Sequence, residues 1–284
     1  MKNGRFSKGY SLVVREQDMT GFLPAIAEAG FDGIEPTFVA GGLPSPENHL
    51  VEARRLRAVC DGLGLAVPSM RGGRVPWTTI ISPDAGERAR ALDHTRRACE
   101  ALAELGGSVL LVVPGERTPG IDLDTHWHRV VDYGRAAADI AAGFGMRIGL
   151  ENVEARFPSS ERDWLALLRE IGSDRIGLYL DVGNVLWMGF GYPEDWIRTL
   201  GKHIVQVHFK DASYRLSGAT LHAEIRQLLD GEVDWPEVMR ALDEVSYRGW
   251  ISVEPESYRH LPGRLPRRLA ADLDELFKLG TGGT

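Results

Sequence analysis

The sequence predicts an α/β fold: a single (β/α)8 TIM barrel with its active site at the C-terminal ends of the strands. Strand-like apolar runs alternate with segments of helical spacing from one end of the chain to the other. There are eight such runs, the number that closes a barrel. No Gly-x-Gly-x-x-Gly follows the first run, which disfavours an open dinucleotide-binding sheet.

The eight runs are expected to be strands buried on both faces, because such strands appear as continuous apolar stretches. Those of the first half begin near Gly9, Gly33, Leu65 and Val109. Those of the second half cover residues 148–151, 176–181, 204–208 and 250–254. Between the runs, segments such as 87–105 and 127–142 carry apolar residues at helical spacing.

Capping signals mark the expected helix boundaries. Ser45-Pro46 and Ser82-Pro83 each place an N-cap residue before a proline at the first helical position, and Asp234 begins a looser version of the signal. At the helix ends, glycines are expected to take the left-handed conformation before the next strand begins. These glycines are Gly30, Gly64, Gly106, Gly145 and Gly249.

Length and composition set the class of protein. A chain of 284 residues suits one barrel domain, with the barrel at about 9–279 and a flexible tail at 280–284. The net charge of −7 argues against a nucleic-acid partner, and no apolar stretch of ~18 residues predicts a membrane span. No apolar signal core follows the basic start. Cys60 and Cys99 are expected to be packed thiols, which fits a cytoplasmic location.

Each of the last four runs ends in a side chain that can hold a metal ion. These residues are Glu151, Asp181, His208 and Glu254. Three carboxylates and one imidazole suit a divalent ion such as Mn, Mg or Zn. Taken singly, each has a plainer role, such as a loop residue, an Asx turn or an interior histidine. Their occurrence at four successive strand ends favours one shared divalent metal ion.

The motifs at these strand ends resemble those of the xylose-isomerase-like TIM barrel superfamily, in particular its sugar-phosphate isomerase/epimerase group. The matching segments are Leu150-Glu151-Asn152, Leu180-Asp181-Val-Gly-Asn184, Val207-His208-Phe-Lys210-Asp211, 231–235 and Val253-Glu254. The resemblance runs from Tyr10 to about Leu279. It implies that Glu151, Asp181, His208 and Glu254 are metal ligands and that Glu151 and Glu254 are the catalytic pair.

Two positions depart from the resemblance. Many ketose 3-epimerases of this kind carry a histidine where this chain has Asn184, and the asparagine looks more like the L-xylulose-5-phosphate 3-epimerase branch. Relatives often show a substrate-contacting histidine at the end of strand 3, where this chain reads Ser69-Met-Arg71-Gly-Gly-Arg74. Both arginines could bind a phosphate or carboxylate, or could be ordinary surface residues.

Further substrate contacts are expected on the loops and strand ends of the same rim. The candidates are Asn184, Lys210, Arg71, Arg74, Glu35, Arg156, Trp77 and Trp187, with Glu154 and Phe190 beside them and His222 and Glu256 as the weakest. Lys210 could neutralise an enediolate or pair with Glu254 or Asp211. Glu35 could equally have a packing role, and the tryptophans could pack their own loops.

Three activities are compatible with this set. The first is metal-dependent isomerisation or epimerisation of a sugar or sugar phosphate, in which a carboxylate removes a proton α to a carbonyl and the metal stabilises the enediolate. The second is β-elimination on a keto-sugar, inosose or 3-keto-glycoside. The third, an endonuclease of the same superfamily, would need more histidines and a basic groove. We expect a small carbohydrate substrate, with a slight preference for a phosphorylated one, and pairing into a homo-oligomer.

Overall fold

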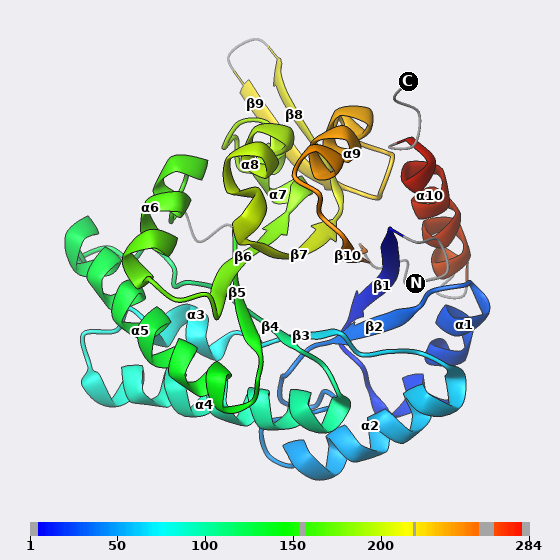
Figure 1. Cartoon of the computed structure of the whole chain (residues 1–284), viewed down its shortest axis with the longest axis horizontal. Helices are drawn as coiled ribbons and strands as arrows, with labels where there is room; N and C mark the ends of the chain where they lie inside the picture. Colours follow the sequence, from blue (N-terminus) through cyan, green and yellow to red (C-terminus); the bar gives the residue numbers. More distant parts are fainter. Residues whose placement is uncertain (1–4, 154–156, 218–219, 256–263, 280–284) are drawn as a thin grey trace.

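The computed structural model describes residues 5–153, 157–217, 220–255 and 264–279. Its central feature is a sheet of eight parallel strands that forms a nearly closed barrel, as predicted (Figure 1). The strands are β1 (Phe6–Leu12), β2 (Gly33–Pro36), β3 (Ser69–Arg71), β4 (Val109–Val112), β5 (Arg147–Glu151), β6 (Ile176–Asp181), β7 (Ile204–Phe209) and β10 (Gly249–Val253). Their order is β2-β1-β10-β7-β6-β5-β4-β3, and two isolated bridges connect β2 with the β3 segment.

Helices surround the barrel and pack their apolar faces against it (Figure 1). They are η1 (Glu16–Met19), α1 (Phe22–Glu28), α2 (His49–Leu63), α3 (Val75–Thr79), α4 (Ala85–Leu105), α5 (Leu123–Gly143), α6 (Glu161–Ile171), α7 (Val182–Trp187), α8 (Pro193–Leu200), η2 (Gly201–His203), α9 (Trp235–Glu244) and α10 (Leu265–Leu279). No helix within the described ranges is long and apolar enough to cross a membrane. Both cysteines are free and buried, as expected.

Two of the three predicted N-caps are wrong. The α2 helix begins at His49, and the Ser45 hydroxyl accepts only from the Asn48 amide at 3.4 Å, in the turn before the helix. In α4 the cap is Asp84, whose carboxylate accepts from the Gly86 amide at 2.6 Å, while Ser82 again shapes the preceding turn. Asp234 caps α9 as predicted.

Four of the five predicted helix-ending glycines take the left-handed conformation. Gly30, Gly64, Gly106 and Gly145 all have positive φ. The prediction for Gly249 is wrong, because this residue begins β10 and Ser246 takes the left-handed position with φ 56°. The run that begins near Leu65 gives only the short β3, since Pro68 has no N–H for a strand ladder.

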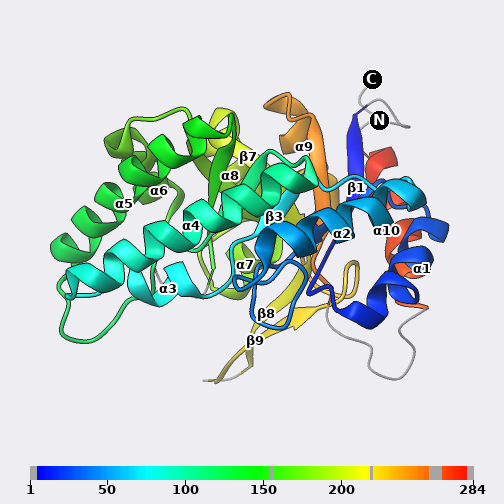
Figure 2. The same ribbon diagram turned by 90° about the horizontal axis from the view of Figure 1, so that it is seen from below.

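A hairpin follows β7 that the sequence analysis did not predict. It pairs β8 (Asp211–Ser217) with β9 (Thr220–Arg226) in antiparallel register, and Figure 2 shows it projecting from the barrel face opposite the N-terminus. Asp211 anchors its base: the buried carboxylate accepts from the Trp235 indole at 2.9 Å and from the Val233 amide at 3.2 Å. The hairpin thus lies on the face where the barrel strands end.

Candidate metal centre and active site

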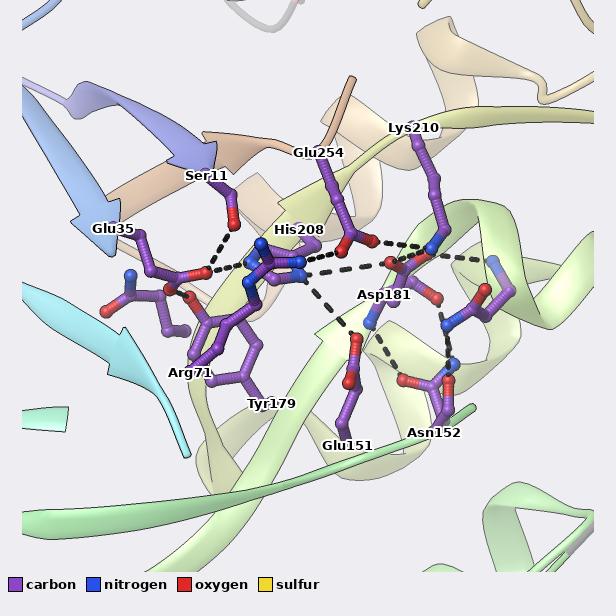
Figure 3. Close-up of polar contacts among 12 residues, drawn as sticks. Ser11, Glu35, Arg71, Glu151, Asn152, Tyr179, Asp181, His208, Lys210 and Glu254 are labelled. Atoms are coloured by element: carbon purple, nitrogen blue, oxygen red, sulfur yellow. Dashed lines mark hydrogen bonds and ion pairs between the residues drawn. The ribbon is translucent and has the colours of Figure 1, made fainter. Parts of the chain in front are cut away.

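The four predicted ligands come together at the C-terminal ends of four strands that are neighbours in the sheet (Figure 3). Each of Glu151, Asp181, His208 and Glu254 offers one ligand atom, and these atoms lie within 4.8 Å of one another. The barrel explains the convergence, because neighbouring parallel strands lie about 4.8 Å apart and end at the same rim. The side chains of the first three are buried and that of Glu254 is partly exposed.

Two buried polar atoms at the centre of this cluster have no hydrogen-bond partner: Nδ1 of His208 and Oδ2 of Asp181. They lie 3.9 Å apart, and Oε1 of Glu151 is 3.6 Å from the same Nδ1. The nearest cation is the Lys210 ammonium, 3.0 Å from Oδ2 of Asp181. Buried polar atoms without a hydrogen bond are rare in proteins, and a bound ion is one of the reasons for them. The cluster therefore fits a divalent ion.

The charge of the cluster supports the same conclusion. Four carboxylates, including that of Glu35 beneath the rim, face two fixed cations, Lys210 and Arg71. A metal ion binds only the neutral form of the His208 ring, and in that state two negative charges remain without a counterion in a largely buried space. A divalent cation would balance them formally, and three oxygen ligands with one imidazole suit Mn, Mg or Zn.

The pKa directions follow from this crowding. Burial raises the pKa of the Glu151 and Asp181 carboxyls, and the nearby Glu254 raises both further. Burial would also raise the pKa of Glu254, but Lys210 and Arg71 hold it below its usual range. Burial lowers the pKa of His208, yet the surrounding carboxylates outweigh that effect and raise it to about 10. The site thus attracts positive charge strongly.

A ring of hydrogen bonds fixes the Asp181 ligand. Its backbone N–H donates to Oδ1 of Asn152 at 2.8 Å, and Nδ2 of Asn152 donates to the Asp181 carbonyl at 2.8 Å. The Asn184 amide N–H donates to Oδ1 of Asp181 at 2.8 Å, so this carboxylate also caps α7. Asn184 was predicted to contact substrate, but it is fully buried behind Asp181. Asn152, which the sequence showed only as part of the Leu150-Glu151-Asn152 motif, supports Asp181.

Two basic residues hold Glu254. The Lys210 ammonium donates to Oε2 at 2.7 Å, and the Arg71 guanidinium pairs with Oε1. The expected pairing of Lys210 with Glu254 is therefore present, together with its ion pair to Asp181, whereas Asp211 is used by the hairpin. Arg71 comes from the tip of β3, across the barrel from Glu254. Both cations are therefore paired with carboxylates of the candidate metal site.

A cavity of about 1300 Å³ opens above the cluster. Its wall includes the predicted residues Arg71, Arg74, Trp77, Glu151, Trp187, Lys210 and Glu254. The Arg74 guanidinium stacks 5.1 Å above the Trp77 ring and is exposed to solvent. An exposed cation on an aromatic ring at the edge of a cavity suits contact with a polar ligand.

Other predicted contacts lie elsewhere. Phe190 stacks on Trp196 with ring centroids 6.2 Å apart, so it packs the loop. His222 is exposed on β9 of the hairpin. Glu154, Arg156 and Glu256 lie outside the described residues.

Glu35 was expected to contact substrate or to pack, and its side chain is fully buried below the cluster. It bonds to His208 and to three hydroxyls, those of Ser11, Ser69 and Tyr179. None of these three hydroxyl residues was among the predicted site residues. The only signal was a polar residue inside or beside an apolar run, and such a residue can equally be a solvated strand end.

We predict that the protein binds one divalent ion at this cluster. A metal concentration of 100 times Kd should raise the free energy of unfolding by ~2.7 kcal/mol. Asp181→Asn should lose most of this rise, because the amide keeps an oxygen to cap α7 but removes a ligand charge. The matched control is Asp174→Asn, whose side chain is 95% exposed. Thermal denaturation with and without Mn, Mg or Zn is the measurement. Equal stabilisation of both variants would contradict the site.

Comparison with known proteins shows the family. The model for the xylose isomerase-like TIM barrel matches residues 23–278. The 2-oxo-tetronate isomerase of Pectobacterium atrosepticum is 26% identical over 265 residues, 88% of this chain and 91% of that protein. The inosose dehydratase of Geobacillus thermodenitrificans is 26% identical over 259 residues, 81% of this chain and 80% of that protein.

Solved structures show the same fold. An L-ribulose 3-epimerase superimposes with a TM-score of 0.79 at 20% identity, covering 98% of this chain and 95% of that one. The E. coli 3-keto-D-glucoside 4-epimerase superimposes with a TM-score of 0.76, also at 20% identity, covering 96% of this chain and 100% of that one. With the family model matching most of its length, the chain belongs to the xylose isomerase-like TIM barrel family.

Proposed function

We propose that the protein is a divalent-metal-dependent isomerase or epimerase of a small sugar or sugar derivative, acting by removal of a proton α to a carbonyl. One observation carries the proposal. Two carboxylates of the cluster, Glu151 and Glu254, enter it from opposite directions, and a cavity large enough for a sugar opens above them (Figure 3). Moving a carbonyl, or inverting a carbon beside it, needs groups that take and return a proton near one carbon.

The residues then have separate tasks. A divalent cation held by Glu151, Asp181, His208 and Glu254 would supply Lewis-acid polarisation of the substrate carbonyl. Glu254 or Glu151 takes the proton from the adjacent carbon, and the other glutamate returns it on the opposite face. Lys210, which lies within 3.0 Å of both Asp181 and Glu254, keeps a positive charge beside the carbon that becomes electron-rich.

The names of the relatives support a carbohydrate substrate, and they also support a second candidate activity. Inosose dehydratase is one of them, so β-elimination on a keto-sugar or inosose is the alternative activity. It begins with the same proton removal and ends with loss of a hydroxyl group, so the ligand cluster serves both reactions. The two reactions are distinguished by their products: a rearranged sugar from isomerisation or epimerisation, and a dehydrated compound from β-elimination.

We predict that the metal-loaded protein exchanges one substrate proton for deuterium. Ketoses, their phosphates, an inosose and a 3-keto-glycoside are incubated in D2O with Mn, and the products are followed by NMR. Deuterium at a single carbon of a rearranged sugar is the result expected of an isomerase or epimerase. A dehydrated product would replace the proposal with the lyase. No exchange in any compound of the panel would contradict both.

Glu254→Gln should reduce turnover by about 10²–10⁴, because the amide keeps an oxygen ligand but cannot accept the proton. Metal affinity is measured in parallel by titration, so that loss of proton transfer can be told apart from loss of the ion. Glu28→Gln is the matched control, since the Glu28 side chain is 70% exposed. Wild-type turnover in Glu254→Gln would show that another residue moves the proton.

The two rim arginines should behave differently toward a phosphorylated sugar. Arg71 pairs with Glu254, so Arg71→Ala should lower kcat for phosphorylated and free sugars alike. Arg74 has no carboxylate partner among the described residues and stacks on Trp77. Arg74→Ala should therefore raise KM for a phosphorylated sugar far more than for its free form. Steady-state kinetics on both forms is the measurement. An equal effect of Arg74→Ala on both sugars would remove its phosphate-binding role and favour an unphosphorylated substrate.

A further inference from the structure

The side chain with the most hydrogen bonds near the cluster is Glu35, which is not one of the four candidate metal ligands. Glu35, at the end of β2, has no exposed surface, and four donors face its two carboxylate oxygens. Oε1 accepts from the Ser11 hydroxyl at 2.9 Å and lies 2.6 Å from Nε2 of His208. Oε2 accepts from the Ser69 hydroxyl at 2.6 Å and from the Tyr179 hydroxyl.

These partners form a polar layer inside the barrel, contributed by strands around its circumference. Layers of barrel interiors are usually filled by branched apolar side chains, so a polar layer needs another reason. The Gln206 amide of β7 donates to the Ser69 oxygen at 2.6 Å, and the Ser69 hydroxyl in turn donates to Glu35. Both oxygens of Glu35 are then acceptors, which is the bonding of an ionised carboxylate.

An ionised carboxylate has no proton to give, so the 2.6 Å contact with His208 requires the hydrogen to sit on Nε2 of the ring. In the neutral ring that metal binding requires, the lone pair then falls on Nδ1, the atom that has no hydrogen-bond partner and lies 3.6 Å from Glu151 and 3.9 Å from Asp181. A histidine whose second nitrogen is held by a carboxylate binds metal in a fixed orientation and is a stronger donor.

We propose that Glu35 is a positioning residue for the metal site: it fixes the ring orientation and tautomer of His208, so that Nδ1 and not Nε2 is the metal donor. The inference rests on the proposed metal-dependent function, because it assigns a task within that site. Glu35 lies beneath the ligands and not on the cavity wall, so it acts through His208 and contacts no substrate.

The first test uses the wild-type chain loaded with Zn and labelled with 15N at histidine. Long-range 1H–15N spectra distinguish a protonated ring nitrogen from a metal-bound one, and the His208 signals are assigned by their loss in His208→Gln. The expected result is a proton on Nε2 and zinc on Nδ1. Zinc on Nε2 would overturn the inference and leave the metal site intact. If wild type binds no divalent ion by titration, the proposed function fails and the inference with it.

The second test compares affinities for Mn and Zn among variants, by titration. Glu35→Gln keeps an acceptor oxygen but removes the charge, and Glu35→Leu removes both. We expect affinity to fall in that order, by about 10–100-fold for the second. Ser11→Ala is the matched control: it removes one bond to the same oxygen and leaves the pair with His208 in place, so its affinity should stay near that of wild type.

The second test has outcomes that would overturn the inference. Wild-type metal affinity in both Glu35 variants, or an equal loss in Ser11→Ala, would reduce Glu35 to a packing role and overturn the inference. Thermal denaturation shows whether each variant is folded. If neither Glu35 variant folds, the spectra of the zinc-loaded wild type decide the question, because they report the ring nitrogen directly.

Discussion

Mutual repulsion among buried carboxylates is the constraint that organises this end of the barrel. Glu151, Asp181 and Glu254 bring ligand oxygens to within 4.8 Å of one another, in a space that is largely shielded from water. Like charges at that distance and in low dielectric cost several kcal/mol unless cations or hydrogen bonds offset them. Two neighbouring cations offset part of this repulsion: Lys210 pairs with Asp181 and Glu254, and Arg71 pairs with Glu254.

The barrel distributes this task over nearly all of its strands. The candidate ligands come from the ends of β5, β6, β7 and β10, while the groups that hold them come from β2, β3 and α7 and from the residues directly after β5 and β7. Each group therefore reaches the centre from a separate rigid element, and no single loop determines the geometry. A site supported in this way is preorganised, as the proton transfer proposed for it requires.

The sequence predicted the parts of this arrangement that leave a pattern along the chain. Alternating apolar runs and helical segments gave the fold class, and ligand-type side chains at successive run ends gave the cluster. The β8–β9 hairpin was missed although both of its segments alternate polar and apolar residues, a pattern typical of half-buried strands, because the connection between them carries no Asn-Gly or Asp-Gly turn signal. The task of Asn184 was misjudged because its position depends on a hydrogen bond to Asp181 that no spacing rule reveals.

The buried polar layer could not be predicted from the sequence for a related reason. Ser11, Glu35, Ser69 and Tyr179 lie on different strands, and only closure of the sheet brings them together. Single serines and tyrosines in apolar runs are common, so none of them signals a network by itself.

The same reasoning separates the two arginines, which looked equivalent in the sequence. Arg71 is the last residue of β3, so it points toward the barrel axis and meets Glu254. Arg74 lies three residues later, after Gly73 with its positive φ of 73° and directly before α3. One arginine therefore belongs to the charge balance of the cluster, and the other faces the cavity mouth on Trp77. One short arginine-containing segment thus supplies both a partner for Glu254 and a cation on the cavity wall.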